Sequence, residues 1–154
     1  MGIKGFLKAL QGHKRIGLDT SVLIYHVEGI QPYSALTAAL FDWVGDMGIS
    51  LVLSTLIWTE MLAKPFKEGN QEAIGRVETF LRSIPKALWL PLDEEVAKEA
   101  ARIRGVYNLR TPDAIVVATS LVGGATTLVT NDADMKRVGR EGLKIFVLKE
   151  FVCP

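Results

Sequence analysis

Four acidic residues stand at positions where they could support a metal-dependent hydrolysis. Asp19 and Asp132 each follow a short β-rich run directly, whereas Glu60 and Asp113 lie early in apolar helical stretches. If the β-rich runs form a parallel sheet, their carboxyl ends meet at one edge, where α/β proteins bind their ligands. The four acids would then converge from four separate segments of the chain.

Carboxylates that share a site repel one another, so a bare cluster of this kind is unfavourable. A divalent cation removes the repulsion, and ligands that are all oxygen favour Mg²⁺ or Mn²⁺ over Zn²⁺. The chain has one cysteine, Cys153, and two histidines. Cys153 therefore offers no internal disulfide and no cysteine-based metal site. We interpret His26 as a packing or surface residue rather than a ligand.

Asp113 also has a simpler interpretation. Residues 109–120 predict a buried helix, with Thr111 as its N-cap and Pro112 as its first residue. In the simpler interpretation, Asp113 only complements the helix dipole, an effect of about 1 kcal/mol or less. The apolar run after Asp113 indicates a helix covered by other elements, so we expect Asp113 at the edge of the core.

β-rich runs alternate with helical segments along the chain. Strands are predicted at 16–18, 49–53, 87–90, 125–129 and 143–147, and helices after Thr55 and at 34–47, 71–83 and 93–105. This alternation predicts an α/β fold, a three-layer α/β/α sandwich with a short central parallel sheet. We expect residues 1–154 to form one domain with its core at about 16–147, because no repeat or linker interrupts them.

The composition is that of a globular protein without a bulk basic surface. Hydrophobic residues make up 49% of the chain, charged residues 23%, and the formal net charge is +1. A near-neutral chain is expected to contact nucleic acid only through a local patch. Lys64, Lys67, Arg104 and Arg110 are candidates for phosphate contacts, although each is more often a solvated charge. The sequence shows no secretory signal and no membrane span, which favours a cytoplasmic protein.

The segments around the acids resemble the four acidic motifs of PIN-domain nucleases. The matching segments are Asp19-Thr20-Ser21, residues 54–60 ending in Glu60, Thr111-Pro112-Asp113-Ala114, and residues 128–132 ending in Asp132. They follow the family's order over nearly the whole chain, from about residue 16 to 147. Length and layout resemble the VapC toxins of bacterial and archaeal toxin–antitoxin pairs. The resemblance implies cleavage of RNA with Mg²⁺ or Mn²⁺, a homodimer, and a small antitoxin protein that blocks the site.

Roles for the first three motifs follow from this resemblance. Asp19, Glu60 and Asp113 resemble the three core acidic positions, which hold the metal directly or through water. Thr20 or Ser21 would bond a carboxylate or an ordered water. The reaction would be metal-assisted hydrolysis of a phosphodiester.

The fourth motif leaves two acids to choose from. Asp132 follows Thr130 and Asn131, where the family has its last motif. Some members place the acid further on, as at Asp134, and Met135 stands where an aromatic residue is usual. We interpret Asp132 as the fourth acid and Asp134 as an exposed acid or a cap.

Two other functions share some of these sequence features. The chain could be a catalytically silent PIN-fold binding or scaffold module whose acids act as caps and dipole partners. A phosphatase of the haloacid-dehalogenase type also begins with Asp-Thr after a strand. That class needs a second Asp two residues on, where this chain has Ser21, so it is excluded. For the homodimer, the apolar faces of helices 34–47 and 57–62 are the expected contact surfaces.

Overall fold

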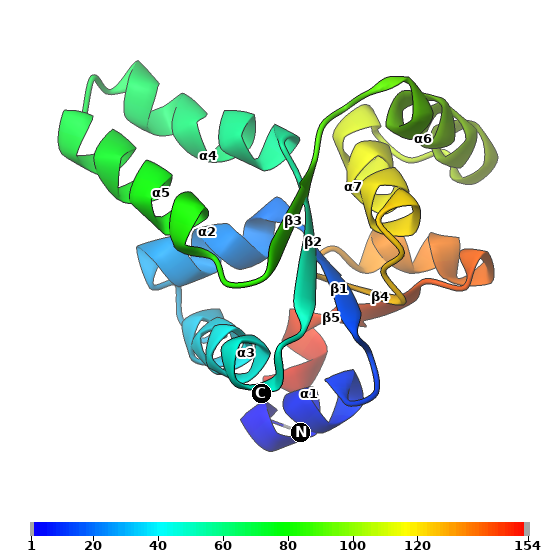
Figure 1. Cartoon of the computed structure of the whole chain (residues 1–154), viewed down its shortest axis with the longest axis horizontal. Helices are drawn as coiled ribbons and strands as arrows, with labels where there is room; N and C mark the ends of the chain where they lie inside the picture. Colours follow the sequence, from blue (N-terminus) through cyan, green and yellow to red (C-terminus); the bar gives the residue numbers. More distant parts are fainter. Residues whose placement is uncertain (1, 153–154) are drawn as a thin grey trace.

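A sheet of parallel strands lies between two layers of helices in the computed structural model, which describes residues 2–152 (Figure 1). Within these residues the strands are β1 (Arg15–Leu18), β2 (Ser50–Ser54), β3 (Ala87–Leu90), β4 (Thr127–Thr130) and β5 (Lys144–Val147). Their order is β3-β2-β1-β4-β5, and every neighbouring pair is parallel. The predicted three-layer α/β/α sandwich is confirmed. The expectation for Cys153 lies outside the described residues.

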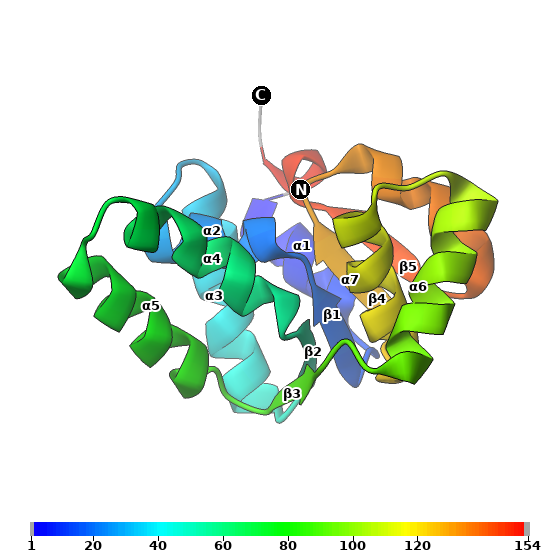
Figure 2. The same cartoon turned by 90° about the horizontal axis from the view of Figure 1, so that it is seen from above.

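Helices cover both faces of the sheet, as the view from above shows (Figure 2). One layer holds α1 (Gly2–Leu10), α2 (Thr20–Glu28), α3 (Tyr33–Met47), α4 (Leu56–Lys67) and α5 (Gln71–Ser83). The other holds α6 (Glu94–Tyr107), α7 (Thr111–Val122) and the 3₁₀ helix η1 (Ala133–Glu141). A last 3₁₀ helix, η2 (Leu148–Phe151), packs near α1. In the described part of the chain, none of the helices is long and apolar enough to cross a membrane.

The central strands are buried on both faces, which explains why their sequences are apolar without alternation. All residues of β4 are buried, as are three consecutive residues of β1. Helix α7 is buried over most of its length, as the apolar run after Asp113 predicts. Its buried hydroxyls are satisfied within the helix, since Thr119 donates to the Ile115 carbonyl and Ser120 to the Val116 carbonyl.

The apolar faces expected to form a homodimer are used inside the monomer instead. Leu36 and Leu40 of α3 and Ile57 of α4 are each no more than 3% exposed. They pack in the core that α1 to α5 form against the sheet. The apolar periodicity of these helices is therefore explained by burial against the sheet, and this reason for a dimer is wrong.

Gly17 in β1 lies so close to α7 that no larger residue fits. An added Cβ would lie 2.1 Å from the Ser120 Oγ and 2.9 Å from its Cβ. Gly17→Ala is expected to lower the free energy of unfolding by about 1–3 kcal/mol, because the strand and helix must move apart. Urea unfolding measures this. Gly75→Ala is the control, because a Cβ there meets nothing within 4 Å. Unchanged stability in Gly17→Ala would contradict the close packing of β1 and α7.

Candidate functional site

A shallow pocket of about 480 Å³ is lined by residues at the carboxyl ends of β1 and β4 and by residues of α2, α4 and α7. We name it the acid pocket. Its lining residues are Asp19, Thr20, Ser21, Ile24, Tyr25, Glu60, Arg110, Asp113, Asn131 and Asp132. All four acids selected from the sequence therefore line one pocket. Of the supporting residues, Thr130 and Asp134 are outside this lining.

Asp19 is the most enclosed of the four acids. It follows β1 and caps α2, and its Oδ1 accepts a hydrogen bond of 2.8 Å from the Thr20 backbone N–H. Its Oδ2 accepts a bond of 2.7 Å from the Thr130 hydroxyl. The pKa of Asp19 is raised to about 6, chiefly by burial. The bonds from Thr130 and Thr20 lower the pKa, whereas the charges of Asp113 and Glu60 raise it, and the value of about 6 is the net result. The two hydrogen bonds therefore hold the carboxylate in one orientation.

Glu60 is tied to the same end of β1 through Thr20. The Thr20 hydroxyl donates a hydrogen bond of 2.7 Å to Glu60 Oε1. Thr20 itself is buried, whereas Glu60 is exposed on α4. Thr20 thus contacts two of the four acids, through its backbone N–H and its hydroxyl.

Asp113 lies in the first turn of α7 and is 14% exposed at its side chain. Its Oδ2 accepts a hydrogen bond of 3.1 Å from Arg110 Nε. Arg110 is also the N-cap residue, so the prediction that Thr111 caps this helix is wrong. Thr111 is already helical, because the extended backbone that precedes the helix belongs to Arg110. Bonding to Asp113, with the charges of Asp132 and Glu60, raises the pKa of Arg110.

Asp132 and Asp134 occupy different surroundings. Asp132 lines the acid pocket, and its backbone N–H donates to the Thr130 hydroxyl. Its side chain caps η1 by accepting a bond of 2.9 Å from the Asp134 backbone N–H. The Asp134 side chain is 72% exposed and pairs at 3.7 Å with Arg137. Asn131, between Thr130 and Asp132, bonds Tyr25 and the Lys149 backbone.

The pocket offers donors that suit a hard divalent cation, because its acidic side chains present only oxygen. A nearby cation would also favour the ionised form of Asp19, which burial disfavours. Ser21 Oγ is buried beside the acids and is without a hydrogen-bond partner in the described residues. Within residues 2–152, however, no three His, Cys, Asp or Glu side chains are grouped closely enough to hold an ion together. Binding would therefore need side-chain movement or bridging waters.

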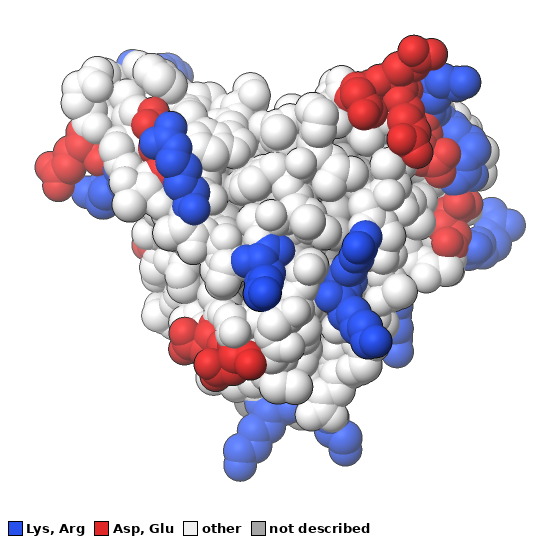
Figure 3. All heavy atoms as spheres, in the orientation of Figure 1, with Lys and Arg blue, Asp and Glu red and all other residues white. Residues whose placement is uncertain are grey.

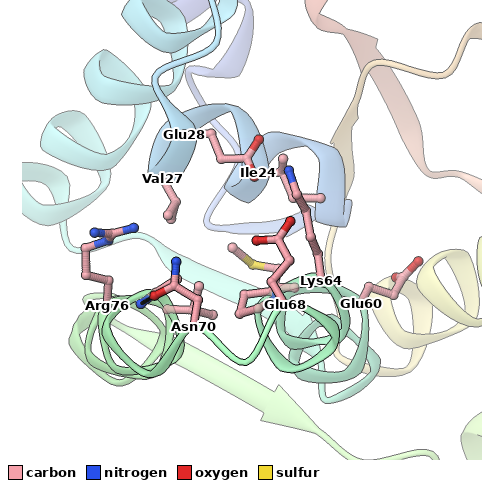
Figure 4. Close-up of a pocket in the computed structure, with 12 residues that line it drawn as sticks. Ile24, Val27, Glu28, Glu60, Lys64, Glu68, Asn70 and Arg76 are labelled. Atoms are coloured by element: carbon pink, nitrogen blue, oxygen red, sulfur yellow. Dashed lines mark hydrogen bonds between the residues drawn. The ribbon is translucent and has the colours of Figure 1, made fainter.

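A second hollow, also of about 480 Å³, adjoins the acid pocket and shares Ile24 and Glu60 with it. It lies between α2 and the α4–α5 pair, and we name it the side groove (Figure 4). Apolar residues such as Met61 form part of its lining, with charged side chains that include Lys64 and Arg76. Lys64 therefore faces the side groove rather than the acid pocket.

Other sequence candidates lie away from the acids. His26 Nδ1 lies 3.3 Å from the Thr37 hydroxyl, and the ring packs on Phe41 and Phe80, consistent with a packing role. Neither Lys67 nor Arg104 is among the residues that line the acid pocket.

Sequence reasoning missed Tyr25 as a pocket residue. Tyr25 stands four residues after Ser21 on α2, so the two share a helix face. This spacing was the signal available in the sequence, but it is equally typical of a core face. Arg110, chosen as a phosphate contact, does line the pocket.

The raised pKa of Asp19 makes a testable contribution to stability. A carboxyl with a folded pKa of about 6 and an ordinary value of 3.8 stabilises the fold at low pH. That stabilisation falls as pH rises and is lost above the folded pKa. Asp19→Asn lacks the titrating carboxyl, so only wild type should lose this stabilisation as the pH rises. In EDTA, the free energy of unfolding of wild type should therefore fall relative to that of Asp19→Asn by about 2–3 kcal/mol between about pH 4 and about pH 8. Asp134→Asn is the control and should show no such trend. A difference for Asp19→Asn that stays constant with pH would contradict the raised pKa.

Comparison with known proteins places the chain in a family. The family model described as PIN domain matches residues 16–141. A toxin–antitoxin complex from Klebsiella pneumoniae contains a similar chain, with a TM-score of 0.64, 22% identity, and coverage of 83% of this chain and 94% of that one. A chain of VapBC2 from Rickettsia felis, bound to a DNA fragment from its promoter, is also similar, with a TM-score of 0.68 and 16% identity. The match covers 86% of this chain and 98% of that one. A chain of VapBC-5 from Mycobacterium tuberculosis, a member of the VapBC family of toxin–antitoxin systems, has a TM-score of 0.59 and 20% identity. That match covers 87% of this chain and 98% of the other.

At these identities the solved structures establish the fold alone. The sequence matches none of the curated proteins with which it was compared. The family model spans most of the chain and all four acid positions. The chain belongs to the PIN domain family.

Proposed function

We propose that the chain is a metal-dependent endoribonuclease that hydrolyses RNA phosphodiester bonds, and that it is the toxin of a toxin–antitoxin pair. One observation carries the nuclease proposal: four acids from four separate segments of a PIN-family chain line one pocket. The toxin role is supported by chains of similar fold in toxin–antitoxin structures.

Mg²⁺ or Mn²⁺ is the proposed cofactor, held directly or through water by Asp19, Glu60, Asp113 and Asp132. Such a cation, when bound, lowers the pKa of a water and offsets charge on the phosphate oxygens. The donor chemistry of the pocket supports this choice, since carboxylate oxygens suit Mg²⁺ and Mn²⁺.

The remaining residues hold the acids in place and receive the substrate. Thr130 and Thr20 orient the Asp19 carboxylate through bonds to its two oxygens. Arg110, with a side chain 80% exposed, stands beside Asp113 at the edge of the pocket. We infer that its guanidinium contacts an RNA phosphate as the strand enters, since only its Nε bonds Asp113 and its other N–H groups are left to donate.

One observation favours the alternative of a catalytically silent binding module. Asp19 caps α2 and Asp132 caps η1, so two of the acids have structural roles that need no metal. Capping does not explain Glu60, which lies within α4 and bonds Thr20. Nor does it explain why Asp19 is buried among other acids, which destabilises its charged form.

A small antitoxin protein is the proposed partner, and the side groove is its proposed docking place. A segment that fills this groove reaches Glu60, which the groove shares with the acid pocket (Figure 4). Such a partner would block entry of RNA to the acids. Toxin, antitoxin and substrate RNA would meet in the cytoplasm.

We further propose that the chain forms a homodimer through the face that carries β3. This strand lies at the edge of the sheet and exposes Leu88. Trp58 and Trp89 pack together beside it at 5.8 Å between ring centroids. Figure 3 shows an uncharged area on the upper part of this face, with basic side chains close below it and acidic side chains at the edges. An uncharged area around a sheet edge favours contact with a second copy.

Cleavage of RNA tests the proposed activity. Purified protein should cut single-stranded RNA with Mg²⁺ or Mn²⁺ and should stop when EDTA is added. Asp19→Asn, Asp113→Asn and Asp132→Asn should each lower the rate by about a hundredfold or more. Asp134→Asn, the matched control outside the pocket, should stay close to wild type. Cleavage that survives EDTA or the loss of Asp113 would place the activity elsewhere.

The dimer proposal predicts a mass of about twice the 16.9 kDa chain at micromolar concentration, measured by light scattering. Leu88→Glu should give a monomer, because a charge at this edge would be buried without a partner. Met47→Glu is the control: Met47 is also apolar and 64% exposed, but it lies at the end of α3. A monomeric wild type would refute the dimer, and a dimeric Leu88→Glu would refute the chosen face.

A further inference from the structure

Tyr25 is a wall residue of the acid pocket that none of the proposed roles uses. It lies on α2, and its ring stacks on Tyr33 with centroids 4.7 Å apart and planes 22° apart. The stack fixes the plane of the Tyr25 ring. The phenol oxygen reaches the segment after β4, where Asn131 contacts it.

The orientation of the Asn131 amide decides what the Tyr25 hydroxyl can do. The Lys149 backbone N–H donates a bond of 2.9 Å to Asn131 Oδ1, which identifies the oxygen end of the amide. The amide nitrogen therefore faces Tyr25 and donates to its phenol oxygen at 3.1 Å. Because the phenol oxygen accepts this bond, its own proton must point elsewhere. Within residues 2–152, no side chain or backbone group accepts that proton.

The acid pocket has few donors to offer a negatively charged substrate. The Thr20 hydroxyl is used by Glu60, and the Ser21 Oγ is fully buried. Arg110, the Tyr25 hydroxyl and the second N–H of the Asn131 amide remain as side-chain donors among the residues that line the pocket. A phosphodiester that enters beside carboxylates needs such donors, because its own oxygens only accept hydrogen bonds.

We propose that Tyr25 is a substrate-binding residue whose hydroxyl donates a hydrogen bond to a non-bridging oxygen of an RNA phosphodiester in the acid pocket. Asn131 is its positioning residue, because the Asn131 amide donates a hydrogen bond to the phenol oxygen. The hydroxyl proton of Tyr25 is thereby directed away from Asn131 and is available to the substrate. This inference rests on the proposed ribonuclease function and identifies a contact that function does not require.

Binding of a fluorescein-labelled oligouridylate, followed by anisotropy in Mn²⁺, tests the contact without a cleavage readout. The Asp113→Asn background slows hydrolysis during the measurement. In that background, Tyr25→Phe should raise the Kd about tenfold, the loss typical of a hydrogen bond to a charged group. Tyr33→Phe is the matched control and should change the Kd by less than about twofold, since Tyr33 is not a lining residue of the pocket.

Three outcomes separate the contact from the function on which it rests. Equal Kd values for Tyr25→Phe and its background would overturn the contact, while RNA cleavage by wild type would still stand. Wild type that neither binds nor cuts RNA would overturn both. The third measurement repeats the binding with an oligodeoxyuridylate, which lacks the ribose 2′-hydroxyl. An increase in Kd for Tyr25→Phe of the same size as with RNA supports a phosphate acceptor. If Tyr25→Phe no longer raises the Kd, the bond belongs to the 2′-hydroxyl and the phosphate contact is overturned.

A double-mutant comparison tests the role of Asn131. Asn131→Ala should weaken binding less than Tyr25→Phe, because the hydroxyl remains but loses its fixed orientation. Adding Asn131→Ala to Tyr25→Phe should produce little further loss. Fully additive losses would overturn the positioning role. Thermal melting of each variant checks that the fold is retained.

Discussion

Burial of a carboxylate beside other acids is the constraint on which this site depends. Asp19 lies at the end of a central strand, where burial, together with the charges of Asp113 and Glu60, raises its pKa to about 6. Two hydrogen bonds, from Thr130 and from the Thr20 backbone, hold the carboxylate against that destabilisation. Without a cation, these surroundings disfavour the ionised form of Asp19. A bound divalent cation would strongly favour that form. This destabilisation of the ionised carboxylate supports the proposed divalent cation.

Parallel topology is what brings the acids together. β1 lies between β2 and β4, and the Asp19 backbone N–H bonds the Val129 carbonyl, so the ends of β1 and β4 are adjacent. This much could be predicted from the sequence, because Asp19 and Asp132 each follow a β-rich run and strand ends share one edge. Asp113 could be placed at the start of a buried helix for a similar reason, since the apolar run after it allowed few other positions.

What could not be predicted depends on side-chain directions and on contacts between distant segments. The sequence placed the cap of α7 at Thr111, one residue too late, because a hydroxyl is the usual cap and Arg110 uses only an extended backbone. The bond between Tyr25 and Asn131 joins residues 106 positions apart, which no local pattern reports. The apolar helix faces could be recognised from the sequence, but the surface against which each one packs could not. Periodicity alone does not distinguish burial against the sheet from burial in a dimer.

Calorimetric titration with Mn²⁺ at neutral pH tests most directly whether the acid pocket is a metal site. Wild type should show a saturable site, and Asp19→Asn should bind Mn²⁺ at least about tenfold more weakly, because the most enclosed carboxylate is lost. Asp134→Asn should bind as wild type does, since its side chain is 72% exposed and outside the pocket lining. A wild type without saturable Mn²⁺ binding, or an Asp19→Asn variant with unchanged affinity, would contradict a metal site in the acid pocket.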